Sequence, residues 1–291
     1  MISFRYHLVS VAAILIALAA GIALGSGPLD DAGETLRGDN GSASVDPALT
    51  SFEDGFAGTM AEGLLKDRLK DQSVVVLTVP GASQGEVNDI TADLLLAGAD
   101  VTGQVELTSK LLDSAGRQFA EGVAEQAAAD LPGVTGATDS YGRIGAALGR
   151  ALLADETADA DQTAMTIRSA FTEGDLITMT TPPEKLATLT VLVTGPQRAG
   201  ADDRSTVIAA LAGALNETGQ GVVVAGPASA STDGGAIKAV RDGASATALS
   251  TVDVTDTASG RIVTVLAAAS QAGGEPGAWG TSRSAGGALP K

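Results

Sequence analysis

The sequence predicts an α/β protein, in which an N-terminal transmembrane helix is followed by an exported domain with a mostly parallel sheet flanked by helices. Two observations carry this prediction. Residues 8–24 form an uncharged apolar run. Further along the chain, short runs of β-branched residues end in Gly or Pro and alternate with helical patterns. Such alternation is typical of a parallel sheet covered on both faces.

The apolar run LVSVAAILIALAAGIAL, residues 8–24, is predicted to cross the inner membrane once. At ~1.5 Å per residue, a helix over these positions is about 25 Å long, close to the hydrocarbon thickness of a bilayer. Arg5 and His7 precede the run, and two aspartates at 30 and 31 follow it. The short N-terminal end is therefore expected in the cytoplasm and the rest of the chain outside it.

A cleaved secretory signal is the alternative, because Ala23-Leu24-Gly25 has the small-x-small form of a cleavage site. The apolar core of a signal usually covers ~7–15 residues, and this run is longer, which favours an uncleaved anchor. Both interpretations export the remainder of the chain.

Small side chains recur every four residues along the predicted anchor, at Ala13, Ala17, Gly21 and Gly25. On a helix they form one strip, which lets two helix backbones approach closely in lipid. We therefore expect a homodimer. The alternative is that Ala and Gly are simply frequent in this composition.

Four segments follow from composition and patterning. They are the cytoplasmic N-terminus and anchor, a linker rich in Gly, Pro and charge, the exported α/β domain, and a Gly-, Ala- and Ser-rich tail expected to be disordered. Their bounds are 1–26, 27–51, 52–272 and 273–291.

The first half of the domain predicts a helix, a strand, a second helix and a second strand. Phe56, Met60 and Leu64 recur at helical spacing within 52–70. The run QSVVVLTVP at 72–80 is a buried strand closed by a turn. A helix then begins at residue 83, with Val87, Ile90 and Leu94 on one face and a stop at residue 98, and the alternating run 100–107 is the next strand. The connection length favours a parallel pair.

The second half repeats this pattern by the same criteria. Residues 132–139 are Gly-rich and predict a loop. The apolar β-branched runs that predict strands are 176–180, 189–193 and 221–225. The segments that predict helices are 109–131, 141–153, 161–171, 202–215, 236–241 and 256–271.

Composition excludes several classes of function. The net charge of −17 argues against nucleic acid and anionic membrane surfaces as partners. Cysteine is absent, and the one histidine is His7, before the anchor. The exported domain therefore has no Ser-His-Asp or Cys-His arrangement and no zinc site of the usual kind. No phosphate-binding G-x-x-x-x-G-K-[ST] motif is present.

Two strand ends, VPGASQGE at 79–86 and VTGPQRAG at 193–200, stand where open α/β sheets bind ligands. Neither matches G-x-G-x-x-G, and glycine at such turns is required by backbone geometry alone. We therefore predict no cofactor-binding residues here.

Asp233, Asp253 and Asp256 form a possible polar interaction site. Asp253 and Asp256 could hold a hard cation or face a partner, but Thr255 or Asp256 also suits the N-cap of the last helix. Asp233, followed by two glycines, could likewise cap the helix near residue 236 or belong to an anion-binding turn that faces Gly226-Pro227. Carboxylate pairs perform acid-base work in glycoside hydrolases. Nothing fixes this pair's separation, and stacking aromatics are scarce at 3%. We predict no catalytic residues, no metal ligands and no enzyme activity.

Several segments resemble the actinobacterial family of mycobacterial copper transport protein B. The resemblance covers nearly the whole chain to residue 271 and is carried by the opening MISFRYHLVSVAAILIALAAGIALGSG, LLKDRLKDQSVVVLTVPGA, GADVTGQVELTSKLLD, GVVVAGPASASTDGGAIKAVRDG and STVDVTDTASGRIVTVLAAA. It implies an N-terminal anchor, a coiled-coil stalk, an exported α/β domain and a role in copper homeostasis and transport. Residues 27–50 are too short and too rich in Gly and Pro for several heptads, so this chain departs from the family at the stalk.

Copper is implied by the resemblance only. It prefers thiolate, thioether and imidazole ligands, and the exported part offers three methionines, Met60, Met165 and Met179, far apart in sequence. We expect them to fill the core.

Some relatives look like cell-separation factors that pair with another membrane protein and act on peptidoglycan hydrolases. The alternative function is therefore a non-catalytic dimeric scaffold that binds a membrane or envelope partner.

Overall fold

The computed structural model describes residues 47–290 except residues 138, 199 and 201. The chain divides into two units, residues 1–50 and 51–291, and the fold below is that of the second unit. The predicted membrane segment 8–24 and its strip, Ala13, Ala17, Gly21 and Gly25, lie outside the described residues. Within the described part of the chain, no helix combines the length and apolar character needed to cross a bilayer.

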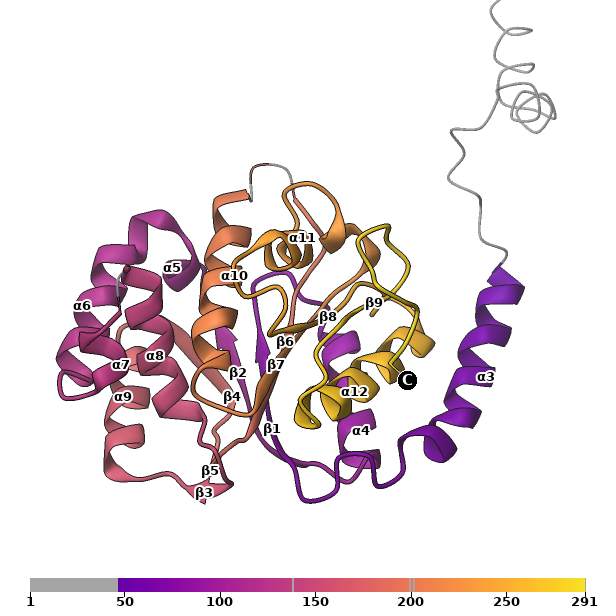
Figure 1. The fold of residues 1–291 in the computed structure, drawn as a ribbon, viewed down its shortest axis with the longest axis horizontal. Helices are drawn as coiled ribbons and strands as arrows, with labels where there is room; N and C mark the ends of the chain where they lie inside the picture. The colour runs from indigo at the N-terminus through magenta and orange to yellow at the C-terminus, as the bar shows by residue number, and fades with distance from the viewer. Residues whose placement is uncertain (1–46, 138, 199, 201, 291) are drawn as a thin grey trace, which may run out of the picture. The chain divides into compact units, whose positions relative to one another are not determined.

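A seven-stranded sheet forms the centre of the domain, with the order β4-β2-β1-β6-β7-β8-β9 (Figure 1). β4 is antiparallel to β2, and the other strand pairs of the sheet are parallel. A short antiparallel pair, β3 and β5, lies apart from it. The strands are β1 Ser73–Thr78, β2 Asp100–Leu107, β3 Ala158–Asp159, β4 Ile177–Thr181, β5 Lys185–Leu186, β6 Leu189–Val193, β7 Gly221–Ala225, β8 Ser250–Val252 and β9 Ala278–Trp279.

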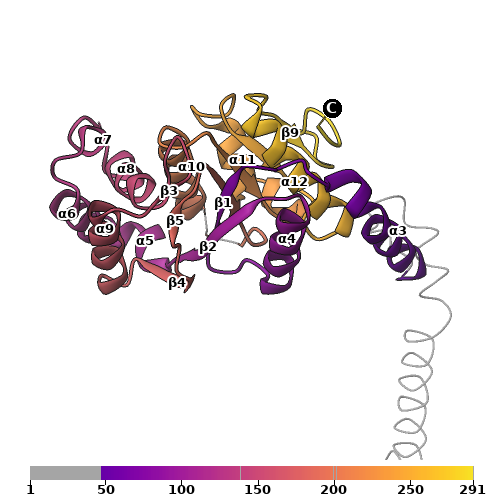
Figure 2. The same cartoon turned by 90° about the horizontal axis from the view of Figure 1, so that it is seen from below.

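Helices cover both faces of the sheet, and Figure 2 shows α8 and α10 on one side of β1 with α4 and α12 on the other. The helices are α3 Pro47–Leu65, α4 Gln84–Leu96, α5 Ser109–Leu112, α6 Arg117–Ala127, α7 Pro132–Thr135, α8 Ser140–Leu152, α9 Gln162–Glu173, α10 Asp202–Asn216, α11 Ala236–Asp242 and α12 Ala258–Ala272, with 3-10 turns at Ser114–Gly116 and Ala228–Ser231. The predicted mixed α/β class with a mostly parallel sheet is confirmed.

Alternate residues of the central strands enter two separate cores. Val75 and Leu77 of β1 pack with the helices from α5 to α11, whereas Val74 and Val76 pack with α3, α4 and α12. Every residue of β1, β6 and β7 is buried. Continuous burial explains why these strands read as unbroken β-branched runs in the sequence.

The face that α3 presents to the core differs from the one its largest side chains suggest. Ala57, Ala61 and Leu65 are the buried residues of this helix. Phe56 and Met60, which belong to the apolar pattern that predicted the helix, are exposed. The helix also begins at Pro47, so the last residues of the predicted linker 27–51 are helical.

The C-terminal tail 273–291 was expected to be disordered, but its described part is ordered. Residues 276–290, here called the strap, fold onto the domain. Trp279 in β9 pairs with Val252 of β8, and its indole packs against the α12 side of the core. Gly280 then donates its amide to the carbonyl oxygen of Gly287. The strap therefore covers the edge of the sheet at β8, which would otherwise present unpaired backbone groups.

Smaller differences concern local breaks. The predicted helix 109–131 is interrupted at Asp113, where the backbone is extended between α5 and the 3-10 turn. The predicted loop 132–139 contains α7, which begins at a proline. β8 was not predicted as a strand, and it lies in a stretch of Ser, Thr and Asp residues just before Asp253.

Candidate functional site

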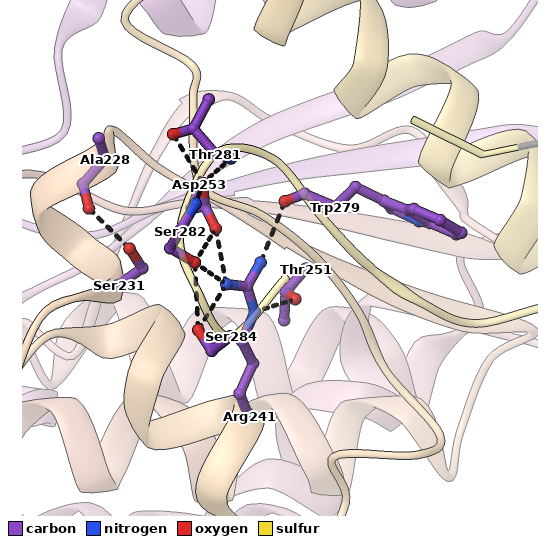
Figure 3. A network of polar contacts seen from close by, with 9 residues as sticks. All are labelled: Ala228, Ser231, Arg241, Thr251, Asp253, Trp279, Thr281, Ser282 and Ser284. Atoms are coloured by element: carbon purple, nitrogen blue, oxygen red, sulfur yellow. Dashed lines mark hydrogen bonds and ion pairs between the residues drawn. The ribbon is translucent and has the colours of Figure 1, made fainter. Parts of the chain in front are cut away.

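Asp253, one of the three predicted site residues, is the centre of a buried polar network (Figure 3). It follows β8, and its side chain is fully buried. Its Oδ2 accepts hydrogen bonds from Arg241 Nη1 at 2.6 Å and from the Ser282 hydroxyl at 2.6 Å. Its Oδ1 accepts the Thr281 amide at 2.7 Å. Both carboxylate oxygens are therefore engaged by α11 and the strap.

Arg241 completes the network from α11, with a side chain only 6% exposed. Its guanidinium donates to the hydroxyls of Thr251, Ser282 and Ser284 and to the carbonyl oxygen of Trp279. Figure 3 shows the guanidinium surrounded by these groups, beside a separate bond from Ser231 to the Ala228 carbonyl. Nothing in the sequence pattern indicated Arg241, because its partners come from segments far apart in the chain.

The electrostatics of Asp253 are those of a structural ion pair. Burial raises the pKa of the Asp253 carboxyl, but hydrogen bonds from Ser282 and the Thr281 amide, together with Arg241, outweigh burial and hold the pKa below its usual value. The carboxylate is thus ionised and fully occupied. A general acid or a cation ligand needs a proton or a free oxygen lone pair at an open position, so this geometry fixes the strap rather than presenting a reactive group.

The structure does not join Asp233 and Asp256 to this network. Both are exposed, and among the described residues neither forms an ion pair with Arg241. Asp256 does not cap α12, and neither does Thr255: the N-cap is Thr257, whose hydroxyl accepts the Gly260 amide at 3.0 Å. Thr255 is instead buried and donates to Glu86 Oε2 at 2.7 Å.

The predicted cap at Asp233 is wrong as well. α11 begins after Gly235, which provides no side-chain hydrogen bond to the helix. The three aspartates of the predicted polar interaction site therefore form one buried structural group and two separate surface groups.

The carboxyl edge of the sheet between β1 and β6 is nearly closed. A Cβ atom on Gly195 would clash with the carbonyl oxygen of Gly81, which shows how closely the two turns approach. The crevice beside them, bordered by Pro80, Thr194 and Arg204, holds about 50 Å³. Nucleotide pockets are several times larger than this crevice.

A larger groove of about 560 Å³ lies between α3, α12 and the end of the strap. Leu64 and Arg68 form one side, Leu266 belongs to α12, and Leu289 and Pro290 close it from the strap. Its charged lining residues are Arg68 and Glu275. Polar and apolar side chains both line the groove, and it is open to solvent.

Two of the three methionines do not fill the core as the sequence suggested. Met60 is 42% exposed and Met165 is 45% exposed, while Met179 is partly buried against the core. Residues 47–290, apart from the three gaps, contain no group of three or more His, Cys, Asp or Glu side chains arranged to hold a metal ion. Copper prefers sulfur or imidazole ligands, and the described residues contain neither cysteine nor histidine.

Comparison with known proteins identifies the family. Residues 1–290 match the family described as "Copper transport outer membrane protein, MctB". The chain is 31% identical over 98% of both chains to proteins named copper transporter MctB from Mycobacterium bovis and Mycobacterium tuberculosis. It is 29% identical to the Mycobacterium leprae protein of that name, over 91% of this chain and 92% of the relative. The match covers the apolar N-terminus as well as the α/β domain, and the chain therefore belongs to the MctB copper transport family.

Proposed function

We propose that this chain is a single-pass inner-membrane protein with an exported α/β domain, which takes part in copper transport or homeostasis in the cell envelope without itself holding copper. Membership of the copper transport family supports the process and the envelope location. The uncharged run 8–24, with positive residues before it, supports the topology.

The proposal that the chain does not itself hold copper rests on where the possible copper ligands lie. The exported part contains no cysteine and no histidine. Its three methionines lie on three different elements, α3, α9 and β4. Met179 packs against the core under the helices from α5 to α11, and Met60 is not part of that core. A copper-binding protein normally gathers two or more soft ligands at one point.

The same domain is proposed to be non-catalytic. Asp253 is fully engaged by Arg241 and the strap, and Asp256 is an exposed carboxylate apart from it. Catalytic pairs require an open site between two carboxyl groups with different pKa values. A protein of this kind acts through binding, and we propose two partners: a second copy, through the strip Ala13 to Gly25, and another membrane or envelope protein.

Complementation of a deletion strain tests this function. We expect loss of the protein to alter copper tolerance, and a variant with Met60, Met165 and Met179 all changed to Leu to restore it. Leu replaces Met with little change in volume, so the fold should survive. Failure of this variant, when it is folded and present in the membrane at normal levels, would contradict the proposal. Chained cells of unchanged copper tolerance would instead support the cell-separation alternative.

Topology needs its own measurement. A reporter that is active only in the cytoplasm, fused behind Lys291, is expected to stay inactive, and one active only outside should function. The opposite pattern would overturn the exported location independently of any copper phenotype.

A further inference from the structure

β4 is the outermost strand at one end of the seven-stranded sheet, and Figure 2 shows it at the margin of the domain. The other end of the sheet is closed, because the strap folds back on β9 and the Gly286 amide donates to the Ala278 carbonyl oxygen at 2.7 Å. β4 has the sequence ITMTT, with no charged residue and no proline inside it. Native proteins usually protect an edge strand with such residues or with a covering segment. β4 therefore offers an open position beside the sheet.

The pairing register shows which backbone groups of β4 are open. The Leu176 carbonyl oxygen accepts the Thr108 amide at 3.0 Å, so residue 176 faces β2. Successive residues of an antiparallel strand direct their backbone groups to alternate edges. The amides and carbonyl oxygens of Ile177 and Met179 therefore point away from β2. Within the residues that the structure describes, β2 is the only strand that pairs with β4, so these four groups have no strand partner.

The open stretch is short and its two faces differ. Ile177 is buried and Met179 is partly buried against the core, whereas the side chain of Thr178 is exposed. The register with β2 shifts at Thr180, and two prolines follow the strand at 182 and 183. Proline has no amide hydrogen to donate. An added strand would therefore be held mainly at residues 177–179, which favours reversible binding.

The charges beside β4 indicate which kind of strand fits. Glu173 ends α9 just before β4, and Glu184 follows the strand. Glu106 of β2 lies opposite Thr178. None of these three glutamates forms an ion pair with another described residue. The edge is therefore acidic at both of its ends and on the neighbouring strand.

The lysines close to this edge do not neutralise it. Lys110 pairs with Asp175 at 3.9 Å, and Lys185 pairs with Asp100 at 2.9 Å, so both already face a carboxylate. A second copy of β4 would bring the same glutamates together, and like charges opposite one another destabilise a strand pair. A basic segment from another protein is the complementary partner.

We propose that the outer edge of β4 binds an extended, basic segment of the envelope partner as an additional strand of the sheet. Backbone hydrogen bonds at Ile177 and Met179 hold the segment, and Lys or Arg side chains near its ends face Glu106, Glu173 and Glu184. This inference rests on the proposed binding function, to which it adds the surface used and the chemistry of the partner.

Peptide binding to the full-length protein in detergent tests the proposal. The probe is a fluorescent peptide with the sequence Lys-Thr-Val-Thr-Val-Thr-Lys. One comparison peptide has glutamate in place of both lysines, and another is N-methylated throughout, which removes its backbone donors. We expect fluorescence anisotropy to show saturable binding of the lysine peptide, about tenfold weaker binding of the glutamate peptide, and no saturable binding of the methylated one.

Two variants examine the backbone contact. Met179→Pro removes an amide that points away from β2, so the pairing with β2 keeps its hydrogen bonds. We expect it to bind the lysine peptide about fivefold more weakly or worse, as the loss of one hydrogen bond implies. Met179→Leu is the matched control and should bind as the wild type does, since it keeps the amide and nearly the same volume.

Charge reversal provides a test that does not depend on the folding of Met179→Pro. The double variant Glu173→Lys and Glu184→Lys should bind the lysine peptide more weakly and the glutamate peptide more tightly than the wild type does. The control is Glu53→Lys with Glu62→Lys on α3, which changes the net charge equally at exposed positions. This control should leave the preference for the lysine peptide unchanged.

Several results overturn the proposal. They are equal binding of the methylated peptide, unchanged binding by folded Met179→Pro, equal effects of the two charge reversals, and no saturable binding of the lysine peptide at millimolar concentration. Tighter binding of a peptide that copies residues 176–182 would show that β4 pairs with a second copy instead. These readouts involve neither copper nor topology, so failure here is distinguishable from failure of the proposed function, which complementation and the reporter fusion test.

Discussion

Arg241 Nη1 lies 2.6 Å from Asp253 Oδ2 in an ion pair whose two side chains are 6% and 0% exposed. The pair connects α11 to the strap, because Ser282 donates to Asp253 and the Trp279 carbonyl accepts from Arg241. An intact buried ion pair adds little to the unfolding free energy compared with well-packed apolar residues in the same place. Removing one partner, however, leaves the other charge buried and uncompensated.

The substitution Asp253→Asn should release the strap and destabilise the domain. It keeps the shape of the side chain but leaves the Arg241 guanidinium buried without a counter-charge, which costs about 3–5 kcal/mol. Urea unfolding gives the loss, and limited proteolysis should cut residues 276–290 first. Asp242→Asn is the control, since Asp242 forms an exposed pair with Lys238 and its loss should not measurably change unfolding. Equal effects of the two variants would show that the network does not fix the strap.

Acid should weaken this network only at low pH. The folded pKa of Asp253 lies below its ordinary value, so the folded state binds fewer protons than the unfolded state in that range. The contribution is fully present above the unfolded pKa of about 3.9 and is lost as pH falls through the folded pKa. The difference in unfolding free energy between the wild type and Asp253→Asn should therefore be constant from pH 7 to 5 and shrink below pH 4. A difference that already shrinks between pH 7 and 5 would contradict the lowered pKa.

Gly280→Ala should disturb the strap by another route. Gly280 has φ of +129°, and a Cβ atom there would collide with Asp253 Oδ1. Backbone strain alone costs about 1–3 kcal/mol, and the collision adds to it. Gly274→Ala is the comparison, because Gly274 has φ of +76° but open space around the added atom. Thermal unfolding should show a larger loss at 280 than at 274; the reverse order would be inconsistent with the described packing.

Two neighbouring leucines lie on different faces of α3. Leu65 is fully buried and Leu64 is 41% exposed. Leu65→Ala should cost about 2–5 kcal/mol in unfolding free energy, as buried Leu-to-Ala changes do. Leu64→Ala should cost less than about 1 kcal/mol, since little apolar area leaves water at that position in a single copy. Similar losses for both, measured in detergent at concentrations where the chain is monomeric, would mean that α3 is turned differently.

The central strands could be predicted from the sequence because local composition and burial agree there. β1, β6 and β7 are buried on both faces, so each consists almost wholly of apolar and β-branched residues. β8 escaped prediction because it has three residues in a run of Ser, Thr and Asp, and only Val252 is apolar. Its strand character comes from pairing with β7 and β9.

Tertiary contacts explain the remaining differences. The strap has a composition typical of disorder, and its order depends on Trp279, Asp253 and Arg241, which meet only in the folded chain. Helical periodicity located α3 but could not tell which apolar row faces the core, because the exposed row is at least as apolar as the buried one. Asp253 was selected as a site residue for its chemistry, and only its partners show that it is structural.

Copper binding by the intact chain tests most directly whether the domain acts without holding the metal. The full-length protein in detergent is equilibrated with buffered Cu(I) and Cu(II), beside a His7→Gln variant that removes the one imidazole. We predict well under one copper per chain at micromolar free copper, with any residual binding removed by His7→Gln. One tightly bound copper per chain that persists in His7→Gln and is lost on changing Met60, Met165 or Asp253 would contradict the proposed function.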